Sequence, residues 1–143
     1  MAIKFLAIIA VCMLSACEKK QRAALAAPPP ATTVPAVTPN PEFRKLLGKW
    51  QRPDGGYVLE IKTVDEPGGK LEAAYFNPQP INVSKALATR DGTSTKVFIE
   101  LRATNYPGST YTLVYDPATD QLKGIYFQAA LKQQFEVFFQ RLK

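Results

Sequence analysis

From residue 50 to the end of the chain, apolar and polar positions alternate in short runs separated by turn-forming residues. A period of two predicts β-strands with one buried face, and these runs are rich in the β-branched and aromatic residues that strands favour. The connections between them are rich in Pro, Gly, Asn and Asp, which form turns. The predicted strands are residues 50–52, 57–64, 70–77, 81–89, 95–103, 109–115, 121–128 and 133–142.

These eight runs are joined by short connections, which predict a simple topology. Short connections force neighbouring strands to be antiparallel, because parallel pairs need long crossovers. An eight-stranded meander closes most simply into a barrel, which removes both edges of the sheet. The sequence therefore predicts an all-β fold, an eight-stranded antiparallel up-and-down barrel. A two-sheet meander sandwich is the alternative.

One short helical turn is predicted before the first strand. Asn40 supplies a capping side chain, Pro41 suits the first helical position and Glu42 places an acid in the first turn. The turn itself covers residues 43–47, and Gly48 ends it.

The alternation also assigns the faces of the strands. Residues 81–89 have no consistent face, since Lys85 shares its face with Val83 and Leu87; a bulge or an exposed edge is predicted there. Elsewhere one face is large enough to fill a small barrel. Its members are Leu59, Ile61, Leu71, Ala73, Tyr75, Val97, Ile99, Leu101, Tyr111, Leu113, Tyr115, Leu122, Gly124, Tyr126, Phe135, Val137 and Phe139.

Two sets of residues are candidates for binding. The first is a group of phenols and amides expected at one mouth of the barrel, which would suit a small amphipathic ligand unless these groups only satisfy one another. This set is Tyr57, Tyr75, Asn77, Tyr111, Tyr126 and Gln128. The second is a group of outward apolar residues on four consecutive strands, where a contiguous cluster would mark contact with a protein partner, a second copy or the chain's own N-terminal turn. This set is Phe98, Val114, Ile125, Phe127 and Phe138.

The N-terminus has the pattern of an export signal. Lys4 precedes an apolar run, residues 5–14, which is too short for an ordinary membrane span. The run ends in Leu14-Ser15-Ala16-Cys17, which resembles the bacterial lipobox. The resemblance implies that residues 1–16 are a cleaved lipoprotein signal peptide and that Cys17 carries acyl chains such as palmitate. Two or three chains at about 0.8 kcal/mol per buried CH2 make a stable membrane anchor. An ordinary secretory signal cut near Ala16 is the alternative.

The lipobox resemblance also implies a location in the bacterial cell envelope. Glu18 follows the cysteine where an aspartate would favour the inner membrane, so the periplasmic face of the outer membrane is expected. Residues 17–41 are rich in Pro and Ala and predict an extended tether. The folded domain is then predicted over residues 42–143.

Composition excludes several classes of chemistry. The chain has no histidine, and its two cysteines, Cys12 and Cys17, both precede the predicted domain. Soft-metal sites, Cys or His nucleophiles and disulfides within the domain are therefore excluded. No spaced pair of carboxylates indicates glycosidase or hard-metal chemistry, so no catalytic residue, metal or cofactor is predicted. The net charge of +6 is spread along the chain and predicts no nucleic-acid partner.

The ends of the predicted barrel carry a family resemblance. Gly48-x-Trp50 at the first strand and Arg141 on the last resemble the residues with which lipocalins and avidins, the calycin superfamily, close one end of their barrels. The resemblance implies that Arg141 stacks on Trp50 as a structural floor. Leu122-x-Gly124-x-Tyr126 is similar to an avidin strand, but biotin sites need several tryptophans and this chain has one.

Together these patterns predict an envelope lipoprotein that presents a non-enzymatic barrel. One hypothesis is that the outer apolar face binds an envelope protein or a second copy of the chain. The alternative is a calycin-like carrier that holds a small amphipathic ligand inside the barrel. A hydrolase is a third hypothesis.

Overall fold

The computed structural model describes residues 39–143. The predicted signal peptide, the predicted lipid-attachment residue Cys17 and the predicted tether up to residue 38 lie outside the described residues. At the start of the described chain, a 3-10 helix, η1 (Pro41–Leu46), forms where the helical turn was predicted. Its cap is the predicted one, because the Asn40 side chain accepts a hydrogen bond from the Glu42 N–H at 3.1 Å.

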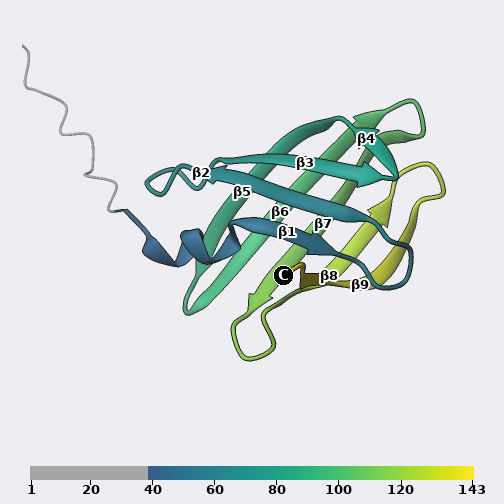
Figure 1. The fold of residues 1–143 in the computed structure, drawn as a ribbon. Coiled ribbons are helices and arrows are strands. Elements are labelled where there is room, and N and C mark those ends of the chain that lie inside the picture. Colours follow the sequence, from purple (N-terminus) through teal and green to yellow (C-terminus); the bar gives the residue numbers. More distant parts are fainter. Residues whose placement is uncertain (1–38) are drawn as a thin grey trace, which may run out of the picture. The chain divides into compact units, whose positions relative to one another are not determined.

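Nine antiparallel strands form one continuous sheet (Figure 1). The sheet order is β4-β3-β2-β1-β9-β8-β7-β6-β5, so the first and last strands of the chain pair in its middle. Because all nine strands belong to one sheet, the alternative of a two-sheet sandwich is wrong. The strands are β1 (Gly48–Gln51), β2 (Val58–Val64), β3 (Leu71–Asn77), β4 (Gln79–Ile81), β5 (Val83–Asp91), β6 (Ser94–Ala103), β7 (Tyr106–Asp116), β8 (Gln121–Gln128) and β9 (Gln133–Arg141).

The prediction of eight strands was wrong, because the run 81–89 is broken. A tight turn at Pro78 lets β4 pair back on β3. The Asn82 carbonyl then leaves that ladder and accepts a hydrogen bond from the Arg102 N–H at 2.9 Å. The register between β5 and β6 shifts between Val83 and Lys85, so the predicted bulge is present. The shift reverses the parity and turns the small Ala86 and Ala88 toward the core, where both are buried.

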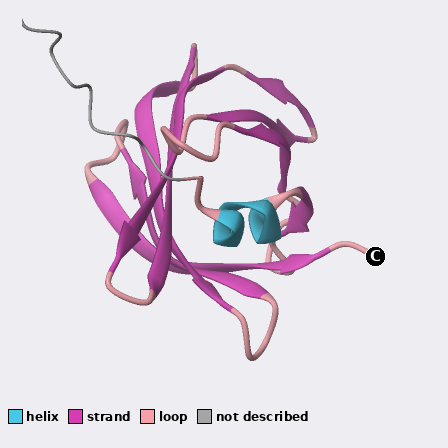
Figure 2. Cartoon of the chain, turned by 90° about the vertical axis from the view of Figure 1, so that its left-hand side faces the viewer, coloured by secondary structure: helices cyan, strands magenta, loops and turns pink. Residues whose placement is uncertain are grey.

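The sheet curls into a nearly closed barrel. Figure 2 looks onto the end of the barrel where η1 lies, with the strands arranged in a ring around it. The two outermost strands of the order, β4 and β5, do not pair with each other. Instead the start of β3 approaches β5 through a single bridge, Lys70 to Leu87, and a 2.6 Å hydrogen bond from the Ala88 N–H to the Gly69 carbonyl. This seam has a single ladder pair, whereas each pair of neighbouring strands in the sheet has at least two.

The core follows the predicted inward face. Most of the predicted interior residues are buried, and Ala73, Tyr115 and Tyr126 are partly buried and pack against the core. Phe135 is the exception at 43% exposed, because its inward position lies at the open end, where no second layer covers it. Phe43 and Leu46 of η1 add to the core from the other end. None of the helices within residues 39–143 has the length and apolar character needed to cross a bilayer.

Candidate functional site: a tyrosine-lined mouth with a buried arginine

The predicted mouth residues meet at one end of the barrel. They come from β3, β7, β8 and the segment before β2, and all line one cavity of about 720 Å³. Its lining includes residues on both sides of the junction between β3 and β4. This junction lies at the end of the barrel opposite η1 (Figure 1). We call this cavity the mouth. The predicted residues that line it are Tyr57, Tyr75, Asn77, Tyr111, Tyr126 and Gln128.

One charged side chain that lines the mouth, that of Arg52, was not predicted from the sequence. This residue directly follows β1 and is only 8% exposed. Its position two residues after the buried Trp50 gives it inward parity, which was the available signal. The predicted strand ended at Arg52, however, and no role was assigned to its side chain. Among the described residues that line the mouth, Arg52 is the only Lys or Arg.

Arg52 is held by one carboxylate and several rings. Its Nε donates to Asp54 Oδ1 at 3.0 Å, its Nη2 donates to Asp54 Oδ2, and its Nη1 donates to the Tyr111 hydroxyl at 3.1 Å. The guanidinium also lies over the Tyr57 ring, 4.6 Å from the centroid. Burial by itself lowers the pKa of Arg52, but the hydrogen bonds to Asp54 and Tyr111 outweigh that effect and raise it. The same ion pair lowers the pKa of Asp54.

Two buried tyrosines continue this network into the barrel. The hydroxyls of Tyr75 and Tyr111 are 2.7 Å apart, and the Tyr111 ring stacks on Tyr126 with centroids 4.6 Å apart. Burial raises the pKa of Tyr111 to about 12 and also raises that of Tyr75. Both phenols are therefore neutral at physiological pH and act only as hydrogen-bonding groups.

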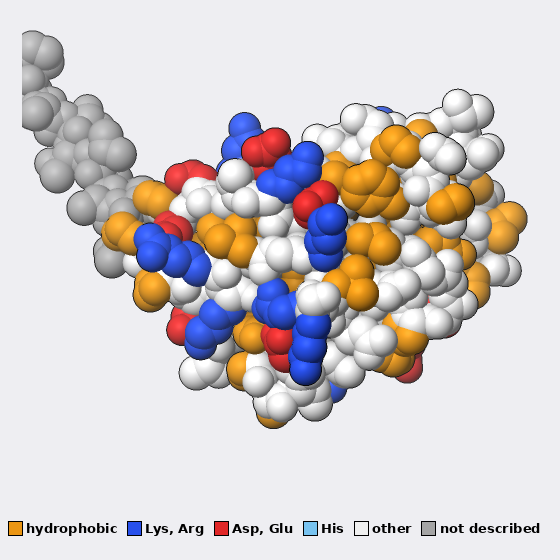
Figure 3. Space-filling model, in the orientation of Figure 1, with side chains coloured by type: hydrophobic (Ala, Val, Ile, Leu, Met, Phe, Trp, Pro, Cys, Tyr) orange, Lys and Arg blue, Asp and Glu red, His pale blue; other side chains and the backbone are white. Residues whose placement is uncertain are grey.

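The rim of the mouth adds amides and further rings. Asn77 Nδ2 donates to the Tyr106 hydroxyl at 2.6 Å, which leaves the Asn77 carbonyl oxygen and the phenolic hydrogen available to a ligand. Phe135 and Glu136 line the same rim. Tyr106 was missed because the sequence analysis placed it in a turn, whereas β7 begins there. On the face drawn in Figure 3, charged side chains gather toward the η1 end and uncharged ones toward the mouth.

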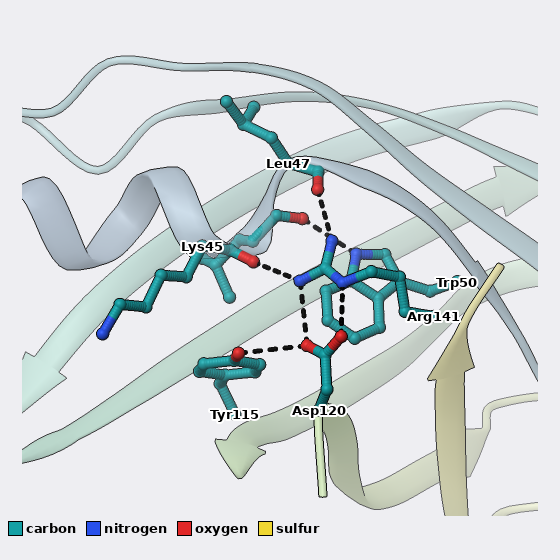
Figure 4. A network of polar contacts seen from close by, with 7 residues as sticks. Lys45, Leu47, Trp50, Tyr115, Asp120 and Arg141 are labelled. Atoms are coloured by element: carbon teal, nitrogen blue, oxygen red, sulfur yellow. Dashed lines mark hydrogen bonds and ion pairs between the residues drawn. The ribbon is translucent and has the colours of Figure 1, made fainter. Parts of the chain in front are cut away.

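The opposite end is closed by Trp50 and Arg141, as the resemblance implied. The Arg141 guanidinium lies 4.0 Å from the centroid of the Trp50 ring. It donates to the Leu47 carbonyl at 2.6 Å, to the Lys45 carbonyl at 2.5 Å and to both oxygens of Asp120 (Figure 4). We call this cluster the floor.

Local geometry explains why the floor has this sequence. Gly48 has a φ of 121°, and a Cβ there would lie 3.2 Å from Arg141 Nη1, so glycine lets η1 turn into β1 directly against the guanidinium. The Trp50 indole N–H donates to the Leu46 carbonyl at 2.8 Å, which ties the same strand to η1. The hydrogen bond from Arg141 lowers the pKa of Asp120, a partner that the sequence analysis did not assign.

The predicted outer set lies on β6, β7, β8 and β9, which are adjacent in the sheet. The apolar positions do not stand side by side, however. Val114 pairs with Lys96 on one neighbouring strand and with Lys123 on the other, so apolar residues meet only along diagonals. Val114 and Phe138 are 36% and 41% exposed, whereas Phe98, Ile125 and Phe127 are half-buried among their neighbours.

Within residues 39–143, no group of three or more acidic, His or Cys side chains is arranged to hold a metal ion. Comparisons of the chain with models of protein families, with curated proteins and with solved structures found no significant match.

Proposed function

We propose that the protein binds a small organic ligand with aromatic and polar groups in the mouth of its barrel. The observation that carries this proposal is the meeting of six predicted side chains and a buried arginine in one open cavity. Ligand sites in proteins are typically concave, measure roughly 300–1,000 Å³ and combine apolar walls with a few convergent polar groups. The mouth has each of these properties.

Binding, and not catalysis, is the role that this chemistry supports. Asp54 is ionised and paired with Arg52, and burial raises the pKa values of Tyr75 and Tyr111, so none of these three groups is poised as a general base near neutral pH. A nearly closed antiparallel barrel with a sealed floor and an open mouth also suits the calycin-like carrier implied by Gly48-x-Trp50 and Arg141.

The test uses a neutral fluorescent probe, N-phenyl-1-naphthylamine, whose emission rises in an apolar site. Gln128→Phe would fill the mouth from β8 and is expected to reduce probe affinity at least about tenfold, since the ring would occupy the ligand's volume. Gln140→Phe is the matched control, because Gln140 is exposed on β9 and does not line the mouth. Equal affinity in both variants, or no probe binding by the unmodified protein, would refute the proposal.

A second proposal is that the outer set docks a second copy of the chain or an envelope protein. The observation in its favour is the exposure of Val114 and Phe138 on one face of the sheet. It is the weaker proposal, because lysines interrupt the apolar positions. If a second copy docks there, Val114→Lys with Phe138→Lys converts a dimer to a monomer in sedimentation, whereas Leu131→Lys, at an exposed site outside this set, does not. A monomeric unmodified protein would exclude self-docking.

We also propose that Cys17 anchors the chain at the periplasmic face of the outer membrane, a proposal that rests on Leu14-Ser15-Ala16-Cys17. Cys17→Ser is expected to release the protein from the membrane fraction and to remove the added acyl mass from the mature chain. Cys12→Ser, within the predicted signal segment, is the control and keeps both. Membrane retention and an unchanged mass in Cys17→Ser would contradict lipidation.

A further inference from the structure

The ion pair in the mouth is unequal in exposure. The Arg52 side chain is 9% exposed, whereas that of its partner Asp54 is 59% exposed. A buried guanidinium needs an anion beside it, because an unpaired buried charge is strongly unfavourable. An exposed carboxylate has no such need, since water solvates it. If another anion replaces Asp54 on Arg52, the Asp54 carboxylate therefore loses little stabilisation.

The turn that carries Asp54 does not depend on the ion pair. Its backbone is closed by a hydrogen bond from the Arg52 N–H to the Tyr57 carbonyl at 2.9 Å and by another from the Gly56 N–H to the Arg52 carbonyl at 3.1 Å. Gly56 has a φ of 69°, a conformation that glycine adopts without strain. The Asp54 side chain can therefore rotate away from Arg52 while the turn keeps its shape.

The guanidinium also has unused donors. Its five N–H groups make three hydrogen bonds, two to Asp54 and one to Tyr111. The fork of Nε and Nη2 that faces Asp54 matches a planar carboxylate in a bidentate arrangement. The guanidinium of Arg52 already lies over the Tyr57 ring, and it is 5.9 Å from the centroid of the Tyr126 ring.

From this geometry we infer that the ligand of the mouth is an aromatic carboxylate. In the free protein, Asp54 occupies the position on Arg52 that the ligand carboxylate would take. The ligand carboxylate replaces Asp54 on the Nε–Nη2 fork of Arg52, and its ring packs among the tyrosines of the mouth. Asp54 turns into solvent and thereby sets the affinity by competition. This inference names the ligand class for the proposed function and rests on it.

The test compares 2-naphthoate with its neutral analogue 2-naphthamide by calorimetry and fluorescence. The unmodified protein is expected to bind naphthoate more tightly than naphthamide. Asp54→Asn removes the competing charge and is expected to tighten naphthoate roughly tenfold while leaving naphthamide unchanged. Arg52→Gln is expected to reduce naphthoate to the affinity of naphthamide.

Asp91→Asn is the matched control, because Asp91 is an exposed carboxylate paired with Lys96 outside the mouth and its loss changes the net charge equally. Circular dichroism establishes whether each variant is folded. If Arg52→Gln does not fold, the Asp54→Asn variant alone tests the inference. If neither probe binds the unmodified protein, the proposed function fails and this inference fails with it. If both probes bind but Asp54→Asn does not favour naphthoate over naphthamide, the inference alone is overturned.

Discussion

Two arginines lie at opposite ends of the barrel, each against an aromatic ring and each paired with an aspartate. They differ in what else they bind. Arg141 donates to two backbone carbonyls as well as to Asp120, so the folded backbone fixes its position. The Arg52 guanidinium donates only to side chains, those of Asp54 and Tyr111, and the Asp54 side chain is exposed. At the scale of single residues, Arg141 is held by the fold itself, whereas Arg52 is the group that we propose for ligand binding.

Arg141→Lys is expected to lower the free energy of unfolding by about 2 kcal/mol, because lysine keeps the charge but cannot reach two carbonyls and a carboxylate at once. Urea denaturation measures the change. Arg90→Lys is the control, since exposed Arg90 makes a single side-chain hydrogen bond, to Thr95, and its replacement is expected to change stability by less than about 0.5 kcal/mol. Equal losses of stability in the two variants would mean that the contacts of Arg141 in the floor do not stabilise the barrel.

The buried phenols predict loss of stability in alkali. Burial raises the pKa of Tyr111 to about 12, whereas a tyrosine in the unfolded chain titrates near 10. Between these values the folded state holds more protons than the unfolded state, so stability falls as the pH rises from 10 toward 12. Tyr111→Phe removes one such group and is expected to make the fall shallower in denaturation series from pH 9 upward. A slope identical to that of the unmodified protein would contradict this assignment.

At the scale of elements, the seam between β3 and β5 depends on close backbone approach. Gly69 has a φ of 69°, and a Cβ there would lie only 2.0 Å from the Ala88 carbonyl oxygen. The hydrogen bond that joins the two strands is made at this same point. A side chain at Gly69 would therefore push apart the strands that close the wall.

Gly69→Ala is expected to cost more than about 2 kcal/mol, since backbone strain of about 1 kcal/mol adds to the displacement of β5. The matched control is Gly92→Ala, at a φ of 58° with no atom within 4 Å of the added Cβ. That variant is expected to show the backbone strain alone. Thermal or urea unfolding of both variants separates strain from clash, and equal losses would show that the seam tolerates the methyl group.

At the scale of the whole molecule, the barrel is one sheet whose two edges nearly meet. Strands β6 to β9 are paired on both sides, whereas β4 and β5 each have a single full partner. Opening of the wall should therefore begin at these edges and not at the β1–β9 pair, which the floor locks.

Hydrogen exchange tests this expectation. Amides of β4 and of β5 are expected to exchange faster than those of β7 and β8, whose N–H groups are held on both sides by neighbouring strands. Peptide-resolved mass spectrometry gives the comparison. Uniform protection across all nine strands would indicate that the barrel opens only by global unfolding.

The sequence by itself determined the all-β class, the antiparallel order, the helical turn at Asn40 and most of the inward face. These are local properties, because a period of two and a turn residue act over a few positions. The six residues that parity and polar character grouped together line one cavity, and their role in binding stays a prediction. The outer set was placed on the correct strands, although the register that interleaves it with lysines was not predicted.

Only the tertiary structure decided the rest. The break between β4 and β5 follows from pairing with β3 and β6, which the pattern within residues 81–89 does not encode. The central charge of the mouth is bound to Tyr111, 59 positions along the chain, and the floor arginine is bound to Asp120, 21 positions away. Such contacts arise when the curled sheet brings distant strands together, so a buried Arg52 and its exposed partner Asp54 became visible only in the folded barrel.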